Sequence, residues 1–303
     1  MRRFILSILT IGLSVTFLLS APTFADENIN YTQLQISPVS QRVVLTPKDT
    51  YTNTFKVENT SEGDLEAKIY ATSFVNLNDS STLGFELKSQ YSQISNWISF
   101  LNNDGNYSKE LSLKLAAGEN QTITYKITAP GNAPGGGQYA TIFAESIPDD
   151  EQGIVTSNRV GLLLYANVKG ETRTGAIISN VKANQVSIDR RVGVNADVEN
   201  TGNIDFQASI KLEISTLFDG QLHHDTATFT ILPESQKPIS LDYDKLSFGF
   251  FKLHYTIEAL DQIVDESCIV LVLPIYIIAI ALFIIVFSII AIVYFIKKRK
   301  STN

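Results

Sequence analysis

The chain has 303 residues and a formal net charge of −7, a length that allows about two domains. All 31 acidic residues but only 18 basic ones lie between Asp26 and Glu266, so this region carries a formal charge of −13. A surface of that sign repels nucleic acid and other polyanions, and no nucleic-acid partner is expected.

The N-terminal segment has the order of a secretory signal peptide. Arg2 and Arg3 precede an apolar run over residues 4–19, and small residues lead up to Ala25. This pattern predicts a signal peptide over residues 1–25 that is cleaved after Ala25. An uncleaved anchor helix is the alternative, although the apolar run is short for a bilayer, which needs about 20 residues.

Residues 26–266 read as an all-β region. Apolar and polar residues alternate in runs such as "ELSLKL", "TITYKI" and "SIKLEI", and turns rich in Gly, Asn and Asp separate these runs. Alternation of this kind is typical of strands with one buried face, and short strands at this spacing indicate a β-sandwich. The predicted fold class is an all-β ectodomain of two tandem immunoglobulin-like β-sandwiches, over residues 26–170 and 171–266.

The tetrapeptide "VENT" supports this division because it occurs at Val57–Thr60 and again at Val198–Thr201. The strands and turns that follow each copy come in the same order. Asn59 and Asn200 are expected to close turns at strand ends, since Asn accepts left-handed backbone angles and forms Asx turns. The match indicates shared architecture and leaves open whether the two halves arose by duplication.

The first sandwich is long for its class, and the surplus is an insertion near residues 75–108. This segment holds the aromatic residues Phe85, Tyr91, Trp97 and Tyr107. Aromatic side chains bury much area at low entropic cost, so these four are the candidate binding surface. The competing interpretation is that Trp97 fills the core of the sandwich.

The C-terminal segment predicts a single membrane-spanning helix over residues 267–296, with its core at 274–296. No charge interrupts it, and a run of that length can cross a hydrocarbon layer of about 30 Å. Lys297, Lys298, Arg299 and Lys300 follow directly as a stop-transfer signal. The positive-inside rule places the tail, residues 297–303, in the cytoplasm and the β-region outside the cell membrane.

Motifs for catalysis are absent from the sequence, and no enzyme activity, cofactor or metal site is predicted. Two stretches contain residue types that can ligate a metal. His223, His224 and Asp225 are adjacent in an expected strand, where neighbouring side chains point to opposite faces. The acidic stretch at residues 148–151 has the composition of a calcium loop, and a solvated turn is the simpler interpretation.

The opening "ISPVSQRVVLTPKDTYTNTFKVENTS", the second β-domain, the apolar helix and the short basic tail together resemble the WxL-interacting protein family of Gram-positive surfaces. That resemblance implies a peptidoglycan-binding domain followed by a domain that binds a protein partner. The opening is also similar to pilus-chaperone-like domains, which share its spacing of Pro, Leu, Phe and Asn.

These features predict a non-enzymatic, membrane-anchored bacterial cell-surface protein. Its sandwiches would bind a cell-wall component such as peptidoglycan, or another surface protein. The alternative is an extracytoplasmic assembly factor or chaperone that adds a strand at a sheet edge. An unpaired long edge in the structure would favour this alternative.

Overall fold

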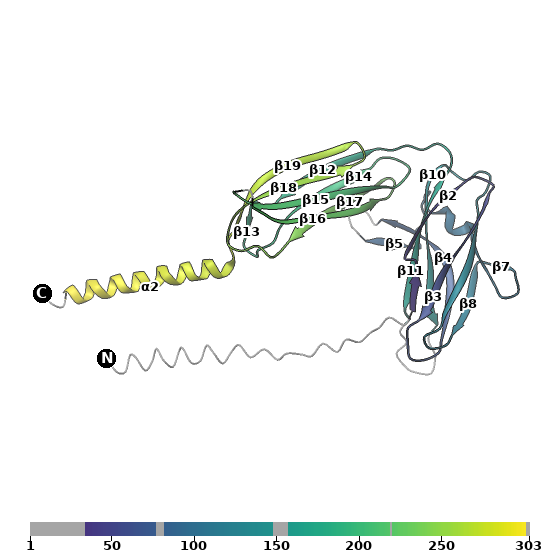
Figure 1. The fold of residues 1–303 in the computed structure, drawn as a ribbon, viewed down its shortest axis with the longest axis horizontal. Helices are drawn as coiled ribbons and strands as arrows, with labels where there is room; N and C mark the ends of the chain where they lie inside the picture. Colours follow the sequence, from purple (N-terminus) through teal and green to yellow (C-terminus); the bar gives the residue numbers. More distant parts are fainter. Residues whose placement is uncertain (1–33, 77–81, 148–156, 219, 301–303) are drawn as a thin grey trace.

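The computed structural model describes residues 34–76, 82–147, 157–218 and 220–300. Two β-sandwiches follow one another along the chain, and a single long helix leaves the second one (Figure 1). The predicted signal peptide with Ala25, and the acidic stretch 148–151, lie outside the described residues.

The first sandwich consists of two sheets packed around one core. One sheet has the order β1-β3-β9-β6-β7 and the other the order β2-β11-β10-β4, and the outer edge of β4 pairs with both β5 and β8. The strands are β1 (Leu34–Ser37), β2 (Ser40–Leu45), β3 (Thr50–Asn59), β4 (Leu65–Asn76), β5 (Leu83–Phe85), β6 (Ile98–Leu101), β7 (Tyr107–Ser108), β8 (Glu110–Leu115), β9 (Asn120–Thr128), β10 (Gly136–Ile147) and β11 (Arg159–Val168).

The second sandwich repeats this plan with fewer strands. Its sheets have the orders β12-β14-β17 and β13-β19-β18-β15-β16. The strands are β12 (Ala176–Ala183), β13 (Val186–Ser187), β14 (Val192–Asn200), β15 (Phe206–Thr216), β16 (Gln221–Ile231), β17 (Ser235–Tyr243), β18 (Gly249–Ala259) and β19 (Gln262–Val272).

Period-2 alternation places one face of each strand in a core. Phe55, Val57 and Tyr125 are buried in the first sandwich, and Leu212 and Ile257 in the second. Burial of this apolar area is the main favourable term for each sandwich. The described chain is therefore mostly β-sheet, in immunoglobulin-like sandwiches followed by one apolar C-terminal helix, which confirms the fold class at that level.

The aromatic insertion is part of the first sandwich. It contains β5, the short 3-10 helix η2 (Gln93–Trp97), β6 and β7. Strand β6 pairs with β9 through Ile98, Ser99 and Phe100, and Phe100 is fully buried. The insertion thus extends a sheet and covers the outer edge of β9.

Helix α2 (Ile275–Lys300) contains one stretch, Ile275–Val293, that is long and apolar enough to cross a membrane, with a mean hydropathy of 3.2. The structure corrects the predicted start of this segment. Residues 267–272 form the end of β19, with Val270 and Val272 buried, because the second core continues to the end of that strand. At the other end the helix continues through Lys297–Lys300, beyond the predicted end at residue 296.

Candidate binding site: the sandwich junction and the open seam

Asp205 joins the two sandwiches at their junction. Its carboxylate accepts a hydrogen bond from the Tyr139 hydroxyl at 3.0 Å and forms an ion pair with Arg42 at 2.6 Å, while its own side chain is 6% exposed. The Tyr139 hydroxyl also accepts the Asp205 amide at 2.9 Å. Burial and the Asp205 carboxylate raise the pKa of Tyr139, so the phenol stays protonated and keeps donating.

Asn203 forms the second connection and explains the run of glycines at 135–137. Its Nδ2 donates to the Gly135 and Glu171 carbonyls, and its own carbonyl accepts the Gly137 amide at 2.7 Å. Gly136 has φ +110, and a Cβ there would lie 2.5 Å from the Asn203 carbonyl oxygen. Only glycine fits at that position, so the junction is a close backbone contact.

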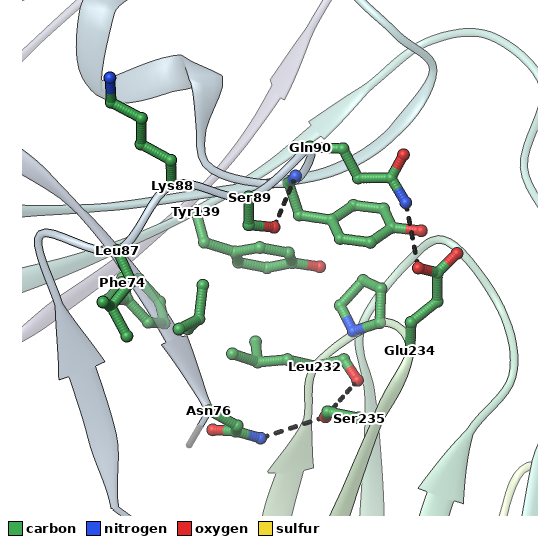
Figure 2. A pocket seen from close by; sticks show the side chains of 13 residues that line it. Phe74, Asn76, Leu87, Lys88, Ser89, Gln90, Tyr139, Leu232, Glu234 and Ser235 are labelled. Carbon is green, nitrogen blue, oxygen red and sulfur yellow. Dashed lines mark hydrogen bonds between the residues drawn. The ribbon is translucent and has the colours of Figure 1, made fainter. Parts of the chain in front are cut away.

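A cavity of about 510 Å³ opens beside this junction. The first sandwich contributes Phe74, Leu87 and Tyr139 to its wall, and the second contributes Leu232–Ser235 (Figure 2). Two hydrogen bonds cross it, from Asn76 to the Ser235 hydroxyl at 3.2 Å and from Gln90 to the Glu234 carboxylate at 3.0 Å. The result is an apolar pocket with a polar rim, which is the usual composition of a ligand site.

The four predicted binding residues lie in three different environments. Tyr91 lines the cavity, and Phe85 packs against the same aromatic cluster as Phe74 and Tyr139. Trp97 packs, partly buried, against the core of the first sandwich. Tyr107 is 39% exposed on β7, with the Lys126 ammonium 3.8 Å from its ring centre.

Sequence reasoning missed the residues that make the junction, above all Arg42, Tyr139, Asn203 and Asp205. Two sequence motifs supply three of these four residues and could have drawn attention to them. The run "PGGGQY" contains Tyr139, and the run "NTGNID" contains Asn203 and Asp205. The first run reads as a Gly-containing entry into a Tyr-bearing strand and the second as a turn, and the contact between the two motifs depends on how the sandwiches stack.

The repeated tetrapeptide aligns the two sandwiches residue by residue. Val57 on β3 pairs with Gln121 on β9, and Val198 on β14 pairs with Lys237 on β17. Strand β17 is therefore the counterpart of β9, and the preceding strand β16 is the counterpart of β8.

This alignment shows a difference at one side of the sandwiches. In the first, β6 pairs with the outer edge of β9. The outer edge of β8 has no strand partner in the described residues. In the second sandwich, β15 and β16 are joined by a short hairpin with no such insertion, so the two sandwiches differ at the β9 and β17 edge, and no strand of the described chain pairs with the outer edge of β16 or of β17. We call these two outer edges the open seam.

The second half of β16 lacks the features that usually block strand pairing. Charges, prolines and bulges protect sheet edges from other chains. Strand β17 carries Pro238 and Lys237, whereas residues 226–231 of β16, "TATFTI", have neither charge nor proline and strong β-propensity. The Lys237 ammonium reaches across the seam to the Thr230 carbonyl at 3.5 Å, and burial lowers the pKa of that lysine.

The seam also leads to the junction cavity. Strand β16 ends at Ile231, the next residues, Leu232–Glu234, line the cavity, and Ser235, the first residue of β17, lines it as well. Backbone groups that can accept a strand and a pocket that can accept side chains are therefore continuous along the chain.

No protein-family model matches the chain, and no curated protein matches it. Among solved structures it is similar to the class 5 fimbriae chaperone CfaA (14% identity, 80% of this chain and 99% of that one, TM-score 0.37). It is also similar to a chain of the CsuC–CsuE pre-assembly complex of Acinetobacter baumannii (13%, 80% and 100%, 0.35) and to the CupB2 chaperone of Pseudomonas aeruginosa (10%, 76% and 97%, 0.34). Similarity at this level assigns no function to this chain.

Proposed function

We propose that the chain is a membrane-anchored extracytoplasmic assembly factor that holds an extended segment of another surface polypeptide on the open seam. One observation carries the proposal. The edge that β6 covers in the first sandwich has no strand partner in the described part of the second. A segment from a partner would enter this side of the second sandwich, which the insertion closes in the first, and would pair with the neutral edge of β16.

The chemistry of the seam supports a polypeptide ligand. A sheet edge offers alternating N–H and C=O groups, and an added strand satisfies them with its own backbone. The neutral stretch of β16 adds no charge repulsion to such pairing. Main-chain hydrogen bonds would give the affinity, and the cavity at the end of β16 would select a side chain.

The cavity favours an apolar side chain from the partner. Phe74, Tyr139 and Leu232 form a buried cluster at its base. Leu87 on its wall is 45% exposed, so a side chain that filled the cavity would cover apolar surface that is open in the free protein.

The anchored location rests on the helix and on the N-terminal segment. Helix α2 has the length and composition of one membrane span, and the predicted signal peptide would export the preceding residues. No catalytic step is part of the proposal. Peptidoglycan, which the resemblance to WxL-interacting proteins implies, is the competing ligand, and the experiment below separates the two.

Photo-crosslinking on the full chain in its native membrane tests this function. A photoreactive amino acid at Thr228, which is exposed on β16, should crosslink to a polypeptide within a segment predicted as a strand. The matched control is Ser112 on β8, the counterpart of Thr228 in the first sandwich, which should not crosslink because Glu110 and Lys114 place charges on either side of it along that edge. Thr226→Lys combined with Thr228→Lys should abolish the product, because charges on an edge oppose strand addition.

Other crosslinking results would contradict the capture of a polypeptide at the open seam. Crosslinks to wall glycan alone would favour the peptidoglycan ligand. Equal crosslinking from residues 228 and 112, or a product that survives the two lysine substitutions, would overturn capture at the seam. A Ser112→Lys variant shows whether added charge alone changes the yield.

A further inference from the structure

Helix α2 begins without a flexible linker. Only Leu273 and Pro274 separate it from β19, and Pro274 is buried. The Leu273 amide donates to the Ser187 carbonyl at 2.7 Å, and the Ile275 amide donates to the Ile188 carbonyl at 3.1 Å. Two backbone hydrogen bonds therefore fix the first residues of the helix to the second sandwich.

The end of the sandwich at which the helix starts carries large apolar side chains in solvent. Ile188, Phe218, Phe248 and Phe250 are 54%, 95%, 54% and 56% exposed, and we call these four the helix-side rim. Strand register places them together at one end. Phe250 pairs with Leu271, Phe218 lies two residues after the end of β15, and the Ile188 carbonyl accepts the amide of the first helix residue. In Figure 1 the helix leaves from the end at which β13 lies.

The composition of the outer sheet face changes with distance from the helix. Near it, Phe250 and Ile269 point to solvent on β18 and β19. Farther along the same strands, His254 faces Asp265 at 3.3 Å, and Glu258 pairs with Lys211 at 2.7 Å. Apart from Leu260 and Ile263 at the far hairpin, the exposed large apolar side chains described on β18 and β19 gather at the helix end.

We infer that the helix-side rim is a membrane-contact surface, seated in the interface of the bilayer that α2 crosses. The rim lies at the level of the first turn of the helix, and aromatic side chains are enriched at that depth. The loops beside it carry Arg190, Arg191 and Lys245 as well as Asp189 and Asp244, so their formal charge is only +1. Apolar insertion of the rim side chains therefore carries most of the contact, with a small contribution from attraction to anionic lipid.

This contact would fix the orientation of the open seam. Phe218 lies in the hairpin that leads into β16, and the other end of β16 leads to the junction cavity. With Phe218 at the lipid surface, the free edge of β16 would run outward from the membrane. The inference rests on the proposed anchoring by α2, but it does not depend on which ligand the seam binds.

Fluorescence of the full chain in nanodiscs of phosphatidylcholine tests the inference. A Trp97→Phe background removes the only native tryptophan, and single tryptophans are then placed by Phe218→Trp, Ile263→Trp or Tyr276→Trp. Ile263 is the matched control, since it is 65% exposed at the opposite end of β19. Tyr276 lies in the first turn of α2 and reports on anchoring itself.

Brominated lipid should quench Phe218→Trp at least twofold and leave Ile263→Trp unchanged, and the emission of Phe218→Trp should shift to the blue. Quenching of Tyr276→Trp without quenching of Phe218→Trp would overturn the rim contact while keeping the anchor. No quenching at either position would overturn the anchoring as well. A blue shift of Phe218→Trp that appears only with two chains per disc would indicate self-association and also overturn the lipid contact.

Discussion

Asn200 repeats in the second sandwich the hydrogen bonds that Asn59 makes in the first. Both residues are fully buried. The Asn59 Nδ2 donates to the carbonyls of Gly63 and Leu115, and the Asn200 Nδ2 donates to those of Ile204 and Ile231, which occupy the matching positions. In both, Oδ1 accepts the backbone amide two residues on. The repeated tetrapeptide is therefore a structural joint that ties a turn to the end of a neighbouring strand.

Replacing either asparagine with alanine should destabilise its sandwich. Asn59→Ala and Asn200→Ala each leave buried carbonyl groups without a donor, at a cost of about 2–3 kcal/mol. Urea unfolding of the full chain in detergent, followed by circular dichroism, measures the loss. Asn195→Ala is the control, because Asn195 is exposed on the same strand as Asn200 and should change stability by less than about 0.5 kcal/mol. A similar loss in all three variants would contradict a specific role for the joint.

Gly136→Ala should loosen the junction between the sandwiches. The added Cβ would meet the Asn203 carbonyl oxygen at 2.5 Å, so the strands at the junction must separate. Gly105→Ala is the matched control, since Gly105 has φ +76 but open space around it. The control should lower the free energy of unfolding by only about 1–2 kcal/mol, because alanine is strained at a positive φ.

Distances between spin labels on the two sandwiches measure the effect. We expect a broadened distance distribution for Gly136→Ala and an unchanged one for Gly105→Ala. A distribution as narrow as that of the wild type in both variants would show that the glycine contact does not hold the two sandwiches together.

The sequence was sufficient for features that depend on local pattern. Alternation predicted the strands, and the apolar run predicted α2, because both reflect which side chains leave water. The end of β19 was misassigned because Cys268–Val272 are apolar at every position, and a run of that kind fits a membrane segment as well as a strand. The junction of Tyr139 with Asp205 and the open seam depend on contacts between distant segments, for which neither periodicity nor spacing carries a signal.

Alkaline pH should weaken the junction through Tyr91. Burial, with a further contribution from the Glu234 carboxylate, raises the pKa of Tyr91 to about 12. The unfolded phenol has a pKa of about 10. The folded state therefore binds the proton more tightly than the unfolded state does. The resulting contribution to the free energy of unfolding is complete below pH 10 and is lost as the pH rises toward 12. Tyr91→Phe removes the titrating group, so its stability should fall less between pH 9.5 and 11.5 than that of the wild type. Identical pH profiles from urea titrations would contradict a role for Tyr91.

Trp97→Ala distinguishes the two interpretations of the aromatic insertion. Trp97 packs, partly buried, against the first core, next to β6 and its buried Phe100. Trp97→Ala should lower the free energy of unfolding by about 2–3 kcal/mol, less than the roughly 3–5 kcal/mol typical for truncation of a fully buried aromatic side chain. Tyr107→Ala, at a side chain 39% exposed, should lower the free energy of unfolding by less than about 1 kcal/mol.

If Trp97 belongs to the core, crosslinking from residue 228 should be unchanged in Trp97→Ala at temperatures where the variant is folded. Lost crosslinking with full stability would instead make Trp97 part of the binding surface, and thermal melts recorded beside the crosslinking assay separate these outcomes.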